Sequence, residues 1–461
     1  MIAFIVGVLV IVVGVAFSIG LHELGHLFFA KRFGVRVGQW MIGFGPTLFS
    51  RKLGETEYGV KAIPLGGYIS MAGMYPPSKQ ERAATAAGRH EDGDPVRPGD
   101  AAPHSRAATT GFFNALVQDV PDDPSLRRLE HEDQRVFYRL SPWKRIVIML
   151  GGPAMNLLIG LVCAVIVLMG FGILQPSLTV GSVSRCVVPQ TAAGQGQSCD
   201  GRAPSPAAAA GIRPGDRIVS VAGSPASSWD QATAIIRRSD GKSIPVTVER
   251  DGARRTLDVT PITNTVAVTD AFGQPVKDGS GTVVTQRVGF VGMGSEYSIQ
   301  QQPVTAVVPY VWANVTGVGN IILNFPQRIV QVAQAAFGGQ DRDPNGPISV
   351  VGVGRLAGEV AAADQAPIAS RAASLISIVG SVNIALFVFN LVPLLPLDGG
   401  HVLGALWEAL RRRLAKLIRR PDPGPVDISK AIPVTLVVTG VLGVTSALLI
   451  YADIVNPIRL F

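Results

Sequence analysis

The feature that most constrains this chain is an uncharged run, Met1–Leu21, that leads directly into the pentapeptide HELGH at His22–His26. The run is long enough to cross a hydrocarbon core of roughly 30 Å. Ionisable side chains at that depth cost roughly 2.5–3.5 kcal/mol each, and HELGH has three of them. Histidines four residues apart share one face of a helix, where both imidazoles can bind one metal ion. The apolar setting therefore favours a metal site over a chance match, with Glu23 as a base that activates water.

The composition indicates a membrane protein that also has a soluble part. Of the 461 residues, 47% are hydrophobic and only 16% are charged, which does not suit a single soluble globule. The first run lacks a basic leader and a small-residue cleavage signal, so we expect it to be retained. We predict a polytopic α-helical membrane protein with four transmembrane helices, at residues 1–33, 143–177, 371–400 and 431–455.

The charge distribution predicts the topology. The net charge is +8, and many of the basic residues flank the spans: Lys31, Arg32, Lys144, Arg145, six lysines and arginines between Arg411 and Arg420, and Lys430. The positive-inside rule then places these loops in the cytoplasm, with both termini and the region between the second and third spans outside. This basic excess requires no nucleic-acid partner. A basic patch for anionic lipid is an alternative, but topology alone accounts for the charges.

Three segments outside the four spans have distinct patterns. Residues 34–75 are rich in Gly, Val and aromatics, which predicts membrane-associated β-hairpins in the cytoplasm. Residues 76–132 are polar and rich in Pro, Ala, Asp and Arg, which is typical of a disordered loop. Residues 302–340 include a charge-free stretch that resembles a fifth span. Prolines interrupt it, and a fifth crossing would reverse the third span, so we expect an amphipathic helix at the interface.

Residues 178–265 are expected to form an extracytoplasmic domain. The stretch Ser205–Gly223 reads as a short helix, a glycine turn and an alternating strand. Its pattern, SPAxxAGIxPGDxIxxVxG, resembles bacterial PDZ domains of the protease-associated kind. That resemblance implies a domain that binds peptide ends by adding them to a sheet edge. Cys186 and Cys199 fall in this domain, and the sequence is compatible with a disulfide or with two free thiols. Cys163 lies in the second span and is expected to fill apolar space.

The third metal ligand is sought among ionisable residues in apolar surroundings. A catalytic zinc usually has three protein ligands and one open position. Asp398 ends a long apolar run and is the one ionisable residue in a setting comparable to that of HELGH. A capping role is the alternative. Pro393 and Pro396 break the helix before Asp398, and irregular backbone at membrane depth is tolerated only where it is buried or lines a cavity. This favours ligation by Asp398.

Together these motifs resemble the site-2 protease family, and in particular its bacterial regulator-of-sigma-E protease branch. The resemblance rests on HELGH, on the PDZ-like stretch and on NLVPLLPLDGGH at Asn390–His401. It also includes GPAMN at Gly152–Asn156, which matches the family's GPxxN motif, and GPIS at Gly346–Ser349. Most of the chain is covered. The exceptions are residues 76–132 and the stretch around Cys186–Cys199.

The resemblance implies a zinc metalloprotease that cleaves single-span membrane proteins within the bilayer. It implies Zn2+ bound by His22, His26 and Asp398, with Glu23 as general base and Asn390 as a candidate for holding the substrate backbone or the oxyanion. Substrates would resemble anti-sigma factors already trimmed outside, and the location would be a bacterial inner membrane. Three further polar residues are expected mainly to pack or to support the site: Asn156, Asn383 and His401.

Two other functions are compatible with parts of the pattern. One is a membrane-anchored PDZ scaffold with an inactive metal site, although an inactive site has no need of Glu23. The other is a metal or ion transporter with intramembrane ligands. The lack of an internal repeat argues against a transporter. Zinc content together with cleavage of a transmembrane substrate distinguishes the three functions.

Overall fold

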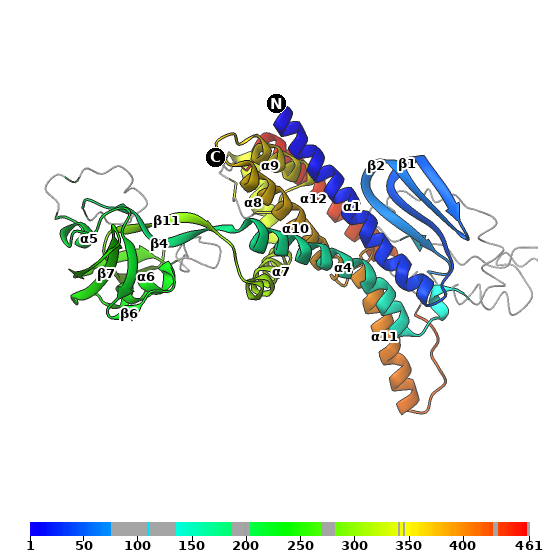
Figure 1. The fold of residues 1–461 in the computed structure, drawn as a ribbon. Coiled ribbons are helices and arrows are strands. Elements are labelled where there is room, and N and C mark those ends of the chain that lie inside the picture. The colour runs from blue at the N-terminus through cyan, green and yellow to red at the C-terminus, as the bar shows by residue number, and fades with distance from the viewer. Residues whose placement is uncertain are drawn as a thin grey trace, which may run out of the picture. The chain divides into compact units, whose positions relative to one another are not determined.

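The computed structural model describes residues 1–74, 108–109, 135–186, 199, 203–268, 282–339, 342–343, 346–426 and 432–458. Two compact units are present (Figure 1). One, the helical unit, combines Met1–Gly170 with Pro303–Phe461, and the other, the insert unit, is Phe171–Gln302. Apart from β3 (Ala108–Thr109), which pairs with a strand described below, the loop predicted at residues 76–132 lies outside the described residues.

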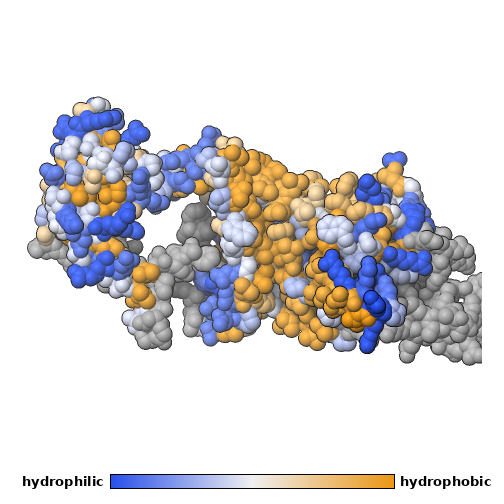
Figure 2. All heavy atoms as spheres, turned by 90° about the horizontal axis from the view of Figure 1, so that it is seen from below, coloured by the Kyte–Doolittle hydropathy of each residue, from blue (hydrophilic) through white to orange (hydrophobic). Residues whose placement is uncertain are grey.

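The helical unit contains the expected apolar helices. They are α1 (Ile2–Arg32), α4 (Pro142–Val165, extended to Phe171 by a π-helical turn), α10 (Ile368–Asn390) and α12 (Ile432–Val455). Their outward surfaces remain apolar, as Figure 2 shows by the orange side chains gathered over this unit. Such surfaces suit contact with lipid, because water would solvate them poorly. The second span is shorter than the predicted 143–177, since a strand already begins at Ile173.

The segment expected to be one interfacial helix at residues 302–340 is instead two helices. A 3-10 turn (Val304–Ala306) leads into α7 (Val307–Leu323), and α8 (Phe325–Gly338) follows after a break at Asn324. Pro326 in the first turn of α8 explains the break. The stretch Val304–Leu323 is also long and apolar enough to cross a membrane, so the described residues contain five candidate spans rather than four. Tyr310 on α7 contacts Ser377 on α10 through their hydroxyls, 3.3 Å apart.

The predicted third span, 371–400, ends earlier than expected. Helix α10 stops at Asn390, and Asp398 is the first residue of a separate helix, α11 (Asp398–Leu417). Pro393 and Pro396 explain the intervening turns, because proline cannot donate the hydrogen bonds that would continue the helix. Neither α11 nor α9 (Val350–Ala362) was predicted. Helix α9 packs on the N-terminal half of α1.

A buried ion pair holds α12 to the start of α9. Asp453 on α12 pairs with Arg342, and both side chains are 3% exposed. The same carboxylate accepts a hydrogen bond of 2.6 Å from the backbone N–H of Ser349, which caps α9. Arg342 also donates to the carbonyl of Pro347 over 2.8 Å. The GPIS motif therefore supplies the hydrogen bonds that hold the start of α9 against α12.

The segment predicted as hairpins at residues 34–75 forms one long, irregular hairpin of β1 (Val37–Leu53) and β2 (Thr56–Met71). Trp40 lies opposite both Ile69 and Tyr58, so the first half of β1 has a partner on each side. Strand β3 extends the sheet at Ser70. The hairpin lies beside α1 (Figure 1). It thereby borders the helix that carries HELGH.

The insert unit is a β-rich domain that is larger than the predicted 178–265. Strands β11, β4, β5, β7 and β8 form its main sheet in that order, β6 pairs with β5, and β9 and β10 form a separate pair. The helices and strands are α5 (Pro206–Ala209), α6 (Trp229–Arg238), β4 (Ile173–Val183), β5 (Arg217–Val221), β6 (Ser224–Pro225), β7 (Ile244–Arg250), β8 (Ala253–Val259), β9 (Ile262–Ala267), β10 (Thr285–Phe290) and β11 (Met293–Gln300). The boundary moves because β11, beyond the predicted end, pairs with β4 at the predicted start.

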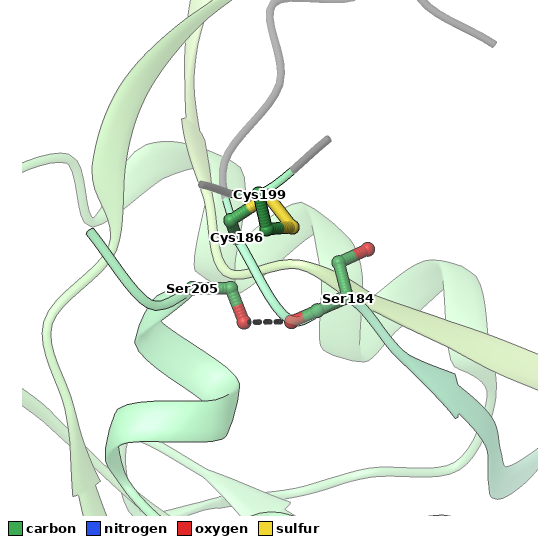
Figure 3. The surroundings of a disulfide bond; sticks show 4 residues. All are labelled: Ser184, Cys186, Cys199 and Ser205. Atoms are coloured by element: carbon green, nitrogen blue, oxygen red, sulfur yellow. Dashed lines mark hydrogen bonds between the residues drawn. A yellow bond between two sulfur atoms is a disulfide. The ribbon is translucent and has the colours of Figure 1, made fainter. Parts of the chain in front are cut away.

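The two cysteines of the insert unit form a disulfide (Figure 3). Cys186 and Cys199 are bonded, so the alternative of two free thiols is wrong. Beside the disulfide, the hydroxyl of Ser205 donates to the carbonyl of Ser184 over 2.5 Å and caps α5. Disulfides persist in oxidising compartments, which agrees with the predicted position of this unit outside the cell. Cys163 in α4 is free.

Candidate metal centre

Helix α1 places both HELGH histidines on one face, toward the interior of the helical unit. The Nε2 atoms of His22 and His26 lie 3.2 Å apart. The side chain of His26 is fully buried and that of His22 is 12% exposed. Glu23, at the next position around the helix, is 3% exposed. At a separation of 3.2 Å the two imidazole nitrogens are close enough to bind the same metal ion.

Asp398 completes the group from the first turn of α11. Its Oδ2 atom lies 3.3 Å from Nε2 of His22 and 3.4 Å from Nε2 of His26. Ligands held at 2.0–2.2 Å around a tetrahedral ion are about 3.3–3.6 Å apart. The three separations therefore match the edges of such a tetrahedron. Within the part of the chain that the structure describes, this is the one group of three His, Cys, Asp or Glu residues whose ligand atoms lie close enough together to hold one metal ion.

The surroundings of these three atoms fit a metal ion. The Oδ2 atom of Asp398 is buried and has no hydrogen-bond partner among the described residues. Gly152 of α4 faces the same point, since a β-carbon there would lie 2.3 Å from Nε2 of His26. Two imidazoles and a carboxylate form a donor set typical of catalytic zinc, which leaves one position open. The residues can therefore hold a divalent ion and leave space beside it.

Helix α4 contacts the Nδ1 atoms of both histidines, on the side of each ring away from the proposed metal position. The Nδ1–H of His26 donates to the carbonyl of Ile148 over 2.8 Å. The amide of Asn156 lies 3.1 Å from Nδ1 of His22. Histidines that bind metal through Nε2 carry their proton on Nδ1 and need an acceptor there. Asn156 provides one when its amide presents Oδ1, and this orientation uses an oxygen that is otherwise buried without a partner in the described structure.

The close crossing of α1 and α4 makes this support geometrically feasible. A β-carbon on Gly25 would lie 2.2 Å from the carbonyl oxygen of Gly151, and one on Gly151 would lie 2.6 Å from that of Gly25. The two backbones thus touch where the middle of HELGH meets the glycines that precede Pro153. Any larger residue would push α4 away and separate Asn156 and Ile148 from the histidines.

The remaining predicted residues are Asn390, Asn383 and His401. Asn390 ends α10 and is half-buried, and its side chain makes no hydrogen bond with the described residues. Asn383 is buried and donates to the hydroxyl of Ser18 on α1 over 2.9 Å, which indicates a packing role. His401, one turn after Asp398, is 7% exposed. The contact between Asn156 and His22 was not predicted, because it depends on how α1 and α4 cross.

Comparison with known proteins identifies the family. The model of peptidase family M50 matches residues 10–419. The chain belongs to peptidase family M50. This is the site-2 protease family that the motifs resemble. The family assignment and the apolar helices together make the chain a multi-pass membrane protein with the fold of a membrane protease.

Several relatives extend over most of the chain. The zinc metalloprotease Rip1 of Mycobacterium tuberculosis is 32% identical over 99% of both proteins. The zinc metalloprotease RasP of Geobacillus kaustophilus is 26% identical and covers 85% of this chain and 86% of its own length. The metalloprotease MmpA of Caulobacter vibrioides is 26% identical and covers 88% of this chain and 89% of its own length. The match spans both units, so the insert unit lies within the region shared with these M50 relatives.

Proposed function

We propose that this M50 peptidase binds Zn2+ through His22, His26 and Asp398 and cleaves membrane proteins within the bilayer. The observation that carries the proposal is the group of three ligand atoms spaced 3.2–3.4 Å apart inside the helical unit. The names of the relatives support zinc as the ion and proteolysis as the reaction. The apolar helices around the group support membrane-embedded substrates.

Glu23 is the proposed general base. When bound, the ion supplies Lewis acidity, which polarises the scissile carbonyl and makes water easier to deprotonate. The carboxylate of Glu23 takes a proton from the attacking water and later gives it to the leaving amine. Burial of Glu23 keeps bulk water from competing for that proton. Asn390, at the end of α10, is proposed to hold the substrate backbone or the oxyanion.

The β1–β2 hairpin is proposed to present the substrate as a strand. A peptide bond in a membrane helix is protected by hydrogen bonding within that helix, so the substrate must unwind before attack. Strand β2 passes directly over the base, because a β-carbon on Gly67 would lie 3.0 Å from Cγ of Glu23. A substrate segment added to this sheet would gain backbone hydrogen bonds as it leaves the helical form. It would then lie beside Glu23.

The substrates are proposed to be single-span proteins, such as anti-sigma factors already trimmed outside a bacterial inner membrane. The insert unit is proposed to be an extracytoplasmic PDZ domain that binds the trimmed peptide end. The SPAxxAGIxPGD pattern and the disulfide support this. Both termini are proposed to lie outside, on the same side as the insert unit. Val304–Leu323 is proposed to remain at the interface despite its length. The basic residues after α1 and along α11 support this topology.

The deciding experiment measures zinc content and proteolysis on the same preparation. The purified chain, reconstituted with a model single-span substrate, should contain about one zinc per chain and cut within the substrate's span. Zinc without cleavage would favour a PDZ scaffold with an inactive site. Ion flux across sealed vesicles would favour a transporter. Cleavage that survives complete removal of zinc would contradict the proposal.

A further inference from the structure

Helix α11 has one face packed against the protein and an opposite face that no described residue covers. The packed face carries His401, Ala405 and Glu408, which are at most 7% exposed. The carboxylate of Glu408 pairs with Arg145 at the start of α4 over 2.5 Å. This buried pair fixes which way the helix is turned. The buried contacts therefore fix the rotation of α11 about its own axis, and with it the side chains that face outward.

The outward face is a continuous apolar stripe, which we call the α11 stripe. Five leucines recur every three or four residues along it: Leu403, Leu406, Leu410, Leu414 and Leu417. Each is between 46% and 79% exposed. At about 100° per residue these leucines fall within an arc of about 80°, and Trp407 borders that arc. A stripe of this length is costly in water, so it needs an apolar partner.

Basic side chains border the α11 stripe. By the same helical geometry Arg413 lies on one side of the leucines and Arg411 on the other. Arg420 follows three residues after the end of α11. The two acidic residues of α11 are Asp398 and Glu408, and both are buried. The exposed surface of the helix therefore carries positive charge and no negative charge. Arg413, Lys416 and Arg420 are exposed and form no ion pair within the residues that the structure describes.

We propose that α11 lies on the membrane surface, with its leucines in the acyl boundary and its basic residues on anionic lipid headgroups. An apolar stripe flanked by lysine and arginine is the pattern of helices that bind in this plane. Trp407 suits the same depth, since indole rings favour the interface. A protein partner would need an acidic rim around an apolar groove. The lipid bilayer that already surrounds the helical unit provides both contacts at once.

Helix α11 carries both the lipid-facing stripe and Asp398, so lipid binding should affect the metal centre. This link rests on the proposed function. Helix α11 begins at Asp398, so a helix held at both its packed and its lipid-facing side keeps that carboxylate in place. Anionic headgroups should accumulate beside α11, by on the order of fivefold for each basic residue near the surface. Zinc should consequently leave more slowly when anionic lipid is present.

The test uses Trp407 as a reporter in the full-length protein. The chain is reconstituted in nanodiscs that contain equal mole fractions of brominated phosphatidylglycerol or brominated phosphatidylcholine. The Trp407→Phe variant is subtracted to isolate the signal. Brominated phosphatidylglycerol should quench Trp407 more strongly, and high salt should remove the difference. Equal quenching by the two lipids, or no quenching by either, would overturn the proposal.

Matched charge variants complete the test. Replacing Arg413, Lys416 and Arg420 with glutamine should abolish the preference for phosphatidylglycerol. Replacing Lys242, Arg254 and Arg255 with glutamine removes the same charge from exposed positions of the insert unit. This control variant should retain the preference for phosphatidylglycerol. Retention of the preference in the α11 variant would overturn the proposal. Should that variant not fold, the salt dependence of the unmodified protein decides. Equal zinc loss to a chelator in both lipids would disprove only the link to Asp398.

Discussion

Glu23 lies between the two HELGH histidines but is not one of the three residues whose ligand atoms converge. Replacing it with glutamine keeps the shape of the side chain and removes the base. Glu23→Gln should therefore retain zinc and lose proteolysis by at least about a hundredfold. His22→Ala should lose both. Metal analysis and a substrate-cleavage assay on the same samples check this, and substantial cleavage by Glu23→Gln would mean that another group deprotonates the water.

Asn156 provides a second test at the scale of single residues. Asn156→Ala removes the group that faces Nδ1 of His22, and we expect zinc affinity to fall about 10–100-fold. Asn156→Asp keeps an acceptor there and should retain most of the affinity. Zinc competition with a chelator measures both variants. Asn383→Ala is the control, because Asn383 contacts Ser18 and not a ligand. A similar loss in that control would show that any buried amide in the bundle affects zinc.

Some site residues could be predicted from local sequence pattern and others could not, for physical reasons. The spacing in HELGH predicts that His22 and His26 share a face, because that relation is local to one helix. Asp398 was found from its apolar setting, and the structure brings it to the same point. The role of Asn156 could not be predicted from local pattern. It follows from the contact of α1 and α4 at Gly25 and Gly151, which is a property of two helices.

The elements of the fold were predicted where hydrophobicity alone decides them. The long apolar helices were expected, but α9 and α11 were not. Helix α11 shows a leucine every three or four residues, yet its basic residues were interpreted mainly as a topological signal, with a basic patch for anionic lipid as the alternative. The segment that contains Val304–Leu323 was predicted not to span, because of its prolines and because a fifth crossing would reverse the third span. Its length and hydropathy are nevertheless sufficient. Composition does not determine whether such a helix crosses a membrane or lies along it.

The contact between α4 and α11 gives a prediction at the scale of elements. Arg145 and Glu408 form a buried pair, with side chains 6% and 1% exposed. Removing one partner leaves a buried charge, so Glu408→Ala should lower the free energy of unfolding by about 3–5 kcal/mol. Replacing both residues with leucine should recover much of that loss. Chemical unfolding in detergent measures the three variants, and a double variant no more stable than Glu408→Ala would mean that the charges themselves are needed.

For the whole molecule, the division of the chain into two units suggests how selection and chemistry are divided. The insert unit has its own sheet and its own apolar core. Ile173 pairs with Gln300, so the two connections to the helical unit lie side by side. A short linker can therefore replace Phe171–Gln302 without separating Gly170 from Pro303. The insert unit carries none of the three proposed zinc ligands.

Deleting the insert unit should leave zinc binding intact and change which substrates are cut. We expect the shortened enzyme to cleave substrates with bulky outer domains that the full chain rejects, because the proposed PDZ gate is gone. Cleavage of full-length and trimmed substrate by both enzymes provides the comparison. A shortened enzyme that folds, binds zinc and still rejects the full-length substrate would place the gate elsewhere, for example in α7 and α8.

Two of the three proposed ligands are close together in the chain, but His26 and Asp398 are separated by 372 positions (398 − 26). During synthesis the histidines enter the membrane first, and the carboxylate emerges only after α4, the insert unit and α10 have been made. A nascent chain therefore has two ligands and an incomplete site for most of its translation. It follows that the proposed zinc site can form only after the chain has been made as far as α11.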